Sequence, residues 1–273
     1  MSTTRWINRG FATIIRSRTI RLVLDLFDAN CALGMVSRPS PAGAFLTADS
    51  LIEHQAGFGI SRALVYHSLA LEEHATVGNE LLIDTVKDYN ELIPSWIALP
   101  HHTGEFPKPE AFVADLRAAH VPAVRIMPDQ HNYLVDDWMM DDLFAALAGN
   151  TPLFWHIEKL DTLTARDLHR VSGDHPSLQI VVCDVDKSIN RTITPLMRAR
   201  PNLWIETGGY RTHRGIEFLS TAVGSDHLVF GSKLPWQAVG PPHAELVYAD
   251  IDTNTRQAIA TENLNRLLEM ESG

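Results

Sequence analysis

Side chains able to carry acid and base chemistry stand at the ends of apolar runs in the second half of the chain. His156 and Asp184 close two such runs, and Lys233 follows a third in the sequence GSKLPW. A histidine or a carboxylate can act as general base or acid, while a lysine ammonium polarises a carbonyl or binds a carboxylate. We therefore predict that His156, Asp184 and Lys233 are the catalytic residues of one site.

Five further side chains are predicted to bind the substrate of this site: Asn30, His67, Arg125, Glu206 and His213. Arg125 interrupts the apolar sequence VRIMP, and a charge there is costly unless it is paired. It is either one half of a buried ion pair or a site for an anionic group of the substrate. His67 has two interpretations as well, because a single histidine at a strand end also serves as a packing residue.

The sequence allows several different roles for Lys233. A protonated lysine paired with Asp184, Asp28 or Glu206 fills the place of a cation, which predicts a site without a metal or other cofactor. A desolvated lysine also forms Schiff bases, and a buried ion pair without chemistry is the remaining interpretation. The alternative with a cofactor is a divalent metal at a relocated site, built from His156, Asp184 and Glu206 with His67 assisting.

The elements that must position these residues are eight short apolar runs that alternate with helical patterns. Near-continuous apolar runs are typical of parallel strands that are buried on both faces. The sequence therefore predicts a single-domain (β/α)8 barrel over residues 21–273, preceded by a short N-terminal helical extension over residues 1–20. The carboxyl ends of the strands form the rim of such a barrel, which is where active sites lie.

The first apolar run, RLVLDLFDANCALG, brings polar residues to this rim at the start of the barrel. We expect its strand to begin at Leu22. Because side chains alternate along a strand, Asp28, Asn30 and Ala32 are expected on one face and Cys31 on the other.

Composition favours a globular protein, and Lys233 and Arg125 predict a small, anionic substrate as its partner. The chain has 273 residues, of which 45% are hydrophobic, and a formal net charge of -10. This acidic balance gives no electrostatic reason to expect nucleic acid or a membrane as a partner. Two distant cysteines predict a reducing compartment, and hence a cytoplasmic location. The apolar content outside the predicted core points to a homo-oligomer.

The order of several landmarks resembles that of the amidohydrolase-related barrels, amidohydrolase family 2. The landmarks are DANCALG after the first run, then HPSLQIVV, NLWIETGGY and HLVFGSKLPW, and finally ENLNRLL. The resemblance implies a TIM barrel from a group that includes hydrolases, decarboxylases and lactonases. It also implies metal ligands in an Asp-x-His-x-His motif, at histidines of the fifth and sixth strands and at an aspartate of the eighth.

This chain departs from the family at most of those metal positions. The first motif reads DANCA, and only the fifth-strand histidine is matched, by His156. The sixth-strand histidine falls at Asp184, and the eighth-strand aspartate falls at Lys233. Asn30 is a weak metal ligand and an ammonium repels a cation, so we predict a degenerate metal site.

Two functions from different classes follow from these observations. The first is a metal-independent hydrolase or lyase that acts on a small carboxylated or lactone-like substrate at the C-terminal rim. The alternative is a barrel that has lost catalysis and serves as a ligand-binding or protein-interaction module. The fold alone does not choose between them, since barrels host many activities.

Overall fold

The computed structural model describes residues 24–38, 40–157, 160–186 and 189–269. Eight parallel strands follow one another around the sheet in sequence order. Backbone hydrogen bonds from Ala29 N to Phe230 O (2.9 Å) and from Ala32 N to Leu234 O (2.8 Å) join the last strand and its loop to the first. The chain therefore folds as a single-domain (β/α)8 barrel, as the sequence predicts.

The strands are short, and most are buried along their whole length. Their bounds are β1 Leu26–Leu33, β2 Ile60–His67, β3 Leu92–Ile97, β4 Ala123–Ile126, β5 Leu153–His156, β6 Ile180–Cys183, β7 Leu203–Glu206 and β8 Leu228–Val229. Each lies within the predicted apolar run or shifts from it by a few residues. Such runs form buried parallel strands because each strand has helices on one face and the barrel interior on the other.

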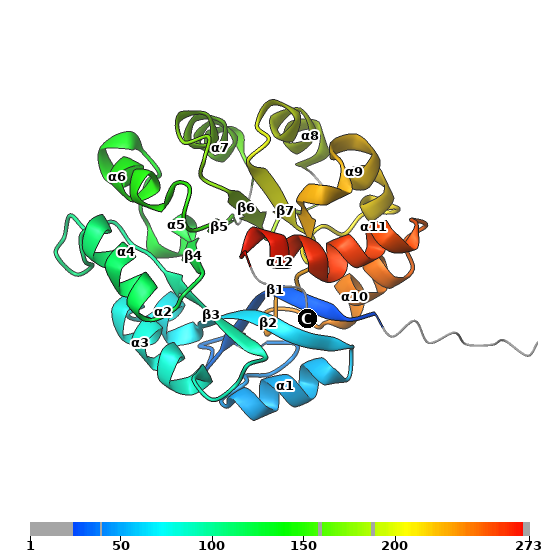
Figure 1. Cartoon of the computed structure of the whole chain (residues 1–273), viewed down its shortest axis with the longest axis horizontal. Coiled ribbons are helices and arrows are strands. Elements are labelled where there is room, and N and C mark those ends of the chain that lie inside the picture. The colour runs from blue at the N-terminus through cyan, green and yellow to red at the C-terminus, as the bar shows by residue number, and fades with distance from the viewer. Residues whose placement is uncertain (1–23, 39, 158–159, 187–188, 270–273) are drawn as a thin grey trace, which may run out of the picture.

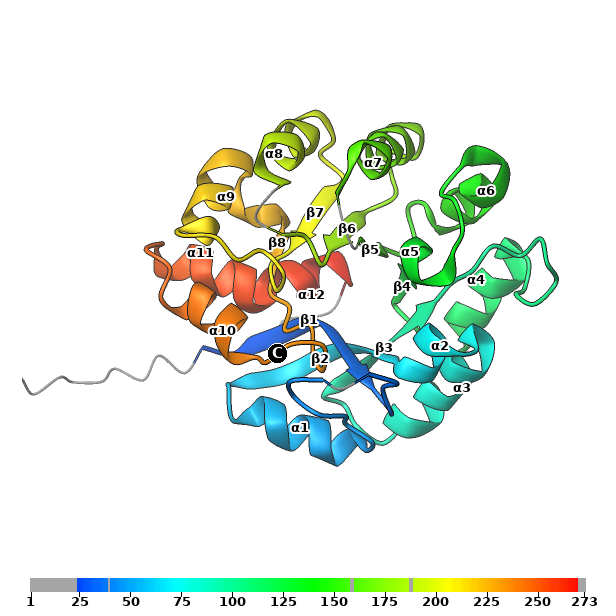
Figure 2. The same cartoon turned by 180° about the vertical axis from the view of Figure 1, so that it is seen from behind.

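Helices form a ring outside the strands, as both views of the molecule show (Figures 1 and 2). Their bounds are α1 Ala48–Ala56, α2 Ser68–Glu72, α3 Ala75–Val86, α4 Pro109–Ala118, α5 Pro128–His131, α6 Asp137–Leu147, α7 Thr162–Asp174, α8 Asn190–Ala199, α9 Gly215–Val223, α10 Gly240–Val247, α11 Thr253–Gln257 and α12 Asn263–Leu267. A 3-10 turn, η2 (Ser225–His227), precedes β8, and a π-helical turn, η3 (Ala258–Glu262), joins α11 to α12. Local signals fix several starts: Thr47 caps α1, Asp161 caps α7 and Pro109 opens α4.

The amino end of the barrel is closed by α12, which lies across it in Figure 1. Leu264 and Leu267 of α12 pack in one buried cluster with Phe27, Val181 and Trp204 of the strands. This apolar plug leaves the opposite, carboxyl end of the barrel for polar residues.

The first strand differs from its prediction in two ways. It begins at Leu26 rather than Leu22, and the predicted N-terminal extension over residues 1–20 lies outside the described residues. The pairing of β1 with β2 shifts between Asp28 and Cys31, which is a bulge. As a result Gln55 Nε2 lies 3.0 Å from Asp28 Oδ2 and 3.5 Å from Cys31 Sγ, so the expectation that these two residues point to opposite faces is wrong.

Both cysteines, Cys31 and Cys183, are free and buried. No helix in the described ranges is long and apolar enough to cross a membrane.

Candidate active site

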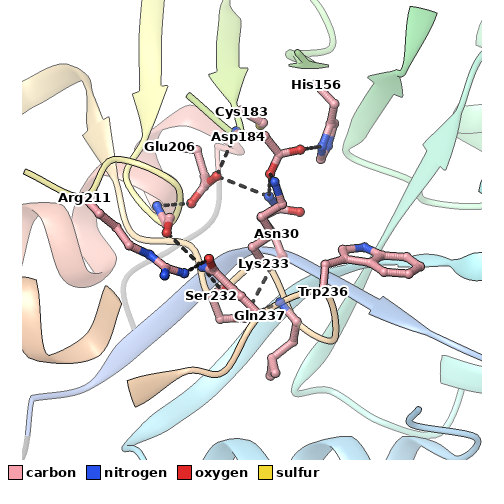
Figure 3. A network of polar contacts seen from close by, with 12 residues as sticks. Asn30, His156, Cys183, Asp184, Glu206, Arg211, Ser232, Lys233, Trp236 and Gln237 are labelled. Carbon is pink, nitrogen blue, oxygen red and sulfur yellow. Dashed lines mark hydrogen bonds and ion pairs between the residues drawn. The ribbon is translucent and has the colours of Figure 1, made fainter. Parts of the chain in front are cut away.

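Asp184, directly after β6, is the centre of a polar group at the carboxyl end of the barrel. Its Oδ2 lies 2.8 Å from His156 Nδ1, at the end of β5. Its Oδ1 lies 3.1 Å from Lys233 Nζ and 3.1 Å from Asn30 Nδ2. Figure 3 shows Asp184 between His156 and Asn30. The structure thus brings together the three residues predicted as catalytic, from three different strand ends.

Six linked residues make up this group, which we call the rim network: Asn30, Arg125, His156, Asp184, Glu206 and Lys233. Two of them hold unusual backbone conformations, with φ of 65° at Asp184 and 58° at Lys233. A left-handed conformation costs roughly 1 to 2 kcal/mol in a residue with a Cβ atom. Such conformations cluster at functional sites, where the surrounding structure holds them in place.

His156 is held as a neutral ring in one tautomer. Arg125 Nη1 lies 2.9 Å from His156 Nε2, and a guanidinium only donates hydrogen bonds, so Nε2 must accept. Nδ1 therefore carries the ring proton and donates it to Asp184. Burial lowers the pKa of His156, and the positive charges of Arg125 and Lys233 add to this effect against the opposing charge of Asp184.

Arg125 is fully buried inside the barrel. It donates to Ser95 Oγ at 2.6 Å, to His156, and to the backbone oxygens of Ala29 (2.8 Å) and Leu64 (3.0 Å). Among the described residues it has no ion pair with a carboxylate, and it does not line the cavity described below. Arg125 therefore orients His156 and the strand ends.

Glu206, at the end of β7, is buried beside the rim network. Its Oε2 accepts from Asn30 Nδ2 at 3.2 Å, and its Oε1 accepts from Gly208 N. A Cβ atom at Gly231 would collide with the Glu206 carboxylate, so a glycine is needed there. Burial, together with the charge of Asp184, raises the pKa of Glu206 to about 7.

Asp184 behaves in the opposite way. Burial alone would raise the pKa of Asp184, but His156 and Lys233 lower it by more and hold it well below its usual range. Asp184 therefore stays ionised at neutral pH, whereas Glu206 is close to half protonated. Of these two neighbouring carboxyl groups, Asp184 keeps its negative charge at neutral pH, whereas the charge of Glu206 changes with pH in this range.

A cavity of about 580 Å³ opens beside this group. Asp184 and Lys233 line it together with Tyr66, Trp236 and Arg38. The Lys233 side chain keeps 30% of its surface exposed and the Asp184 side chain 11%. An ammonium has three donors, so Lys233 can hold Asp184 and still bind a ligand in the cavity.

None of the five residues predicted to bind the substrate lines this cavity: Asn30, Arg125 and Glu206 belong to the rim network, and His67 and His213 lie apart from it. His67 Nδ1 accepts from Leu69 N at 3.1 Å and caps α2. His213 is exposed in a separate cavity of about 250 Å³ beside α9 and α10. Sequence reasoning missed Tyr66 and Trp236, which are joined by a hydrogen bond of 2.9 Å from Trp236 Nε1 to the Tyr66 hydroxyl. The only sequence signal for them is their place next to His67 and within GSKLPW.

Comparison with protein families identifies the class to which this fold and site belong. The model of the amidohydrolase family matches residues 33–269, so the chain is a member of that family, as the sequence landmarks indicate. No curated protein has a significant match to the chain.

Solved structures resemble the chain in fold at low sequence identity. An uncharacterised TIM-barrel protein from Bordetella bronchiseptica is 17% identical with a TM-score of 0.72, covering 90% of this chain and 99% of its own. 5-Carboxyvanillate decarboxylase from Novosphingobium aromaticivorans, complexed with manganese and 4-hydroxy-3-methoxy-5-nitrobenzoic acid, is 15% identical (TM-score 0.71; coverage 90% and 96%). Dihydroxybenzoic acid decarboxylase from Polaromonas sp. JS666, with manganese and 2-nitroresorcinol, is 13% identical (TM-score 0.65; coverage 91% and 98%).

These structures correct the prediction that the site has no cofactor. Manganese is bound in both decarboxylases, so a metal ion is typical of this fold. Within the described ranges of this chain, however, no three His, Cys, Asp or Glu side chains are grouped to hold a metal. Both ring nitrogens of His156 are engaged, and Lys233 places a positive charge on Asp184. The residues of the rim network therefore do not fit a manganese ion. The relocated metal site predicted as the alternative uses three of the same residues, His156, Asp184 and Glu206, and does not fit such an ion either.

Proposed function

We propose that this protein acts as a lyase or hydrolase on a small carboxylated substrate bound in the cavity beside the rim network. The observation that carries this proposal is the position of Lys233, whose ammonium lies 3.1 Å from Asp184 and borders the cavity. The similar decarboxylase structures, which hold nitrobenzoic acid and nitroresorcinol ligands, support a small anionic substrate.

Each residue of the rim network has a distinct part in this proposal. Lys233 binds the carboxylate or carbonyl oxygen of the substrate and stabilises negative charge as it develops. Asp184 borders the same cavity and fixes the direction of the ammonium. His156, which does not line the cavity, positions Asp184 through its Nδ1 proton.

Decarboxylation is the reaction class that we favour. The bond between the substrate and its carboxylate carbon breaks, carbon dioxide leaves, and the electron pair of that bond stays on the substrate carbon. Lys233 stabilises the negative charge until this carbon takes up a proton from water. Hydrolysis of a lactone-like substrate needs a base that activates water. Asp184 is a weak base because its pKa is held low, and His156 Nε2 is blocked by Arg125.

Ligand-induced thermal shifts test the binding part of this proposal. Benzoate, 2-hydroxybenzoate and 2,6-dihydroxybenzoate are compared with benzamide, each with and without added manganese. We expect the acids to raise the melting temperature and benzamide to leave it unchanged. Lys233→Met should abolish the shift, and Lys87→Met is the matched control because Lys87 lies on the surface, where it pairs with Asp84. Equal shifts for benzamide and the acids, or an intact shift in Lys233→Met, would contradict the proposal.

Turnover is then measured for every acid that binds, as carbon dioxide released and as the decarboxylated product. A released product that disappears in Lys233→Met supports a lyase. The second candidate function is a binding barrel without catalysis, which is favoured by the lowered pKa of Asp184 and by the engagement of both ring nitrogens of His156. Binding without turnover by any acid would support that candidate. A cytoplasmic location and a homo-oligomer stay predictions.

A further inference from the structure

The hydroxyl of Tyr66 has a hydrogen-bond donor that no residue in the described ranges of the chain accepts. Trp236 Nε1 donates to this hydroxyl at 2.9 Å, and an indole nitrogen can only donate. The phenol oxygen is therefore the acceptor, and its own proton points elsewhere. None of the described residues accepts that proton in a hydrogen bond.

The ring of Tyr66 is held rigidly, so the position of its hydroxyl is fixed before a ligand binds. Only 2% of the residue is exposed. The Arg125 guanidinium lies 4.9 Å from the ring centroid, and the His156 ring meets the tyrosine edge-on at 5.9 Å. Burial raises the pKa of Tyr66 well above its usual value, and the charge of Asp184 raises it further, so the hydroxyl keeps its proton.

Tyr66, which carries the unused donor, lines the same cavity as Lys233. Tyr66, Lys233 and Trp236 all line it. A carboxylate has two acceptor oxygens, and two fixed donors at one cavity suit such a group.

We propose that Tyr66 is a specificity residue that donates its hydroxyl proton to a second oxygen of the ligand held by Lys233, with Trp236 fixing the direction of this donation. This inference rests on the function proposed above. It adds that the cavity selects ligands by the number of acceptor oxygens that they present. A ligand with two adjacent acceptor oxygens, such as a carboxylate, is held by both donors. A ligand with a single oxygen, such as a phenol, is held by one of them.

The test compares the affinities of benzoate and phenol for the full chain and for Tyr66→Phe, measured by calorimetry. This substitution removes one oxygen atom and keeps the aromatic ring beside Arg125 and His156. We expect the dissociation constant of benzoate to rise about tenfold, in line with the loss of one hydrogen bond to a charged group. The dissociation constant of phenol should change less than twofold.

A purely structural role of Tyr66 predicts a different pattern. If Tyr66 only holds Trp236 in place, Tyr66→Phe weakens benzoate and phenol by the same factor, which overturns the inference. Trp236→Phe is the second variant, because it removes the same internal hydrogen bond and leaves the tyrosine donor in place. It should retain a preference for benzoate over phenol that Tyr66→Phe loses.

Failure of the inference and failure of the proposed function give different results. If the wild-type protein binds no carboxylate in the thermal-shift series, the proposed function fails and the inference fails with it. If the wild-type protein and Tyr66→Phe bind benzoate equally, only the role of Tyr66 is overturned, and Lys233 remains the anchor of the ligand.

Discussion

The two ends of the barrel interior are filled in different ways. At the amino end, Phe27, Val181 and Trp204 pack against Leu264 and Leu267 of α12 in an apolar cluster. At the carboxyl end, the rim network connects buried charged and amide groups through hydrogen bonds and one ion pair with an ammonium. The same eight strands thus supply an apolar plug at one end and a polar site at the other.

The two ends of the barrel place different requirements on the residues that fill them. Apolar packing is non-directional, so many residues of suitable size fill the amino end. A buried polar group needs a partner at the right distance and angle, so each member of the rim network depends on the others. Substitutions at the rim should therefore lower the free energy of unfolding because they leave buried polar groups without hydrogen-bond partners. Substitutions in the plug should lower it because they remove packed side-chain volume.

The largest effect on stability is expected for Arg125→Met. Methionine fills much of the space, but four acceptors lose their donors: Ser95 Oγ, His156 Nε2 and the backbone oxygens of Ala29 and Leu64. At about 1 kcal/mol or more each, the free energy of unfolding should fall by about 4 kcal/mol. Urea denaturation measures this change. Arg117→Met, at an exposed position of α4, is the control and should stay within about 0.5 kcal/mol of wild type. Equal free energies of unfolding for the two variants would contradict the conclusion that buried rim residues need specific hydrogen-bond partners.

Leu264→Ala tests the apolar plug. Leu264 is 1% exposed, and truncating a buried leucine costs about 3 kcal/mol through lost transfer energy and the cavity left behind. Because the plug lies at the opposite end of the barrel from the cavity, the carboxylate affinity of the folded variant should equal that of wild type. Calorimetry under conditions where the variant is folded checks this, and a change in affinity would show that the two ends are coupled.

Glu206→Gln should change the pH dependence of stability. The pKa of Glu206 is about 7 in the folded chain and near 4.5 when unfolded. The folded state therefore binds this proton more tightly, and its contribution to stability is full below about pH 4.5 and is lost as pH rises through 7. Relative to the glutamine variant, wild type should lose up to about 3 kcal/mol between pH 4.5 and pH 8. Urea melts of both proteins across this range measure the difference, and parallel curves would contradict the raised pKa.

The barrel and the centre of its site were predictable because they depend on local patterns. Buried parallel strands produce apolar runs, and the residue after each run lies at the rim. This reasoning found His156, Asp184 and Lys233 as neighbours before the fold was known. It also singled out Arg125 as a charge within an apolar run, and the structure buries this residue fully.

Other features depend on tertiary contacts that no local pattern records. The bulge in β1 turns Asp28 and Cys31 toward Gln55, although strict alternation separates them. Arg125 was expected to pair with a carboxylate or a substrate anion, but backbone oxygens and His156 satisfy it instead. The hydrogen bond between Tyr66 and Trp236 joins residues 170 positions apart in sequence.

The smallest expected effect concerns the protonation of His156 and tests the rim network directly. Because Arg125 occupies Nε2 as a donor, the ring should hold its proton on Nδ1, and its pKa should lie below the ordinary value because burial disfavours the charged ring. Nitrogen-15 chemical shifts of the imidazole should then show one protonated and one unprotonated nitrogen at pH 7. A His156 ring whose pKa is not lowered would mean that Arg125 does not hold Nε2, and His156 would regain the role of general base that its position at the end of β5 first suggested.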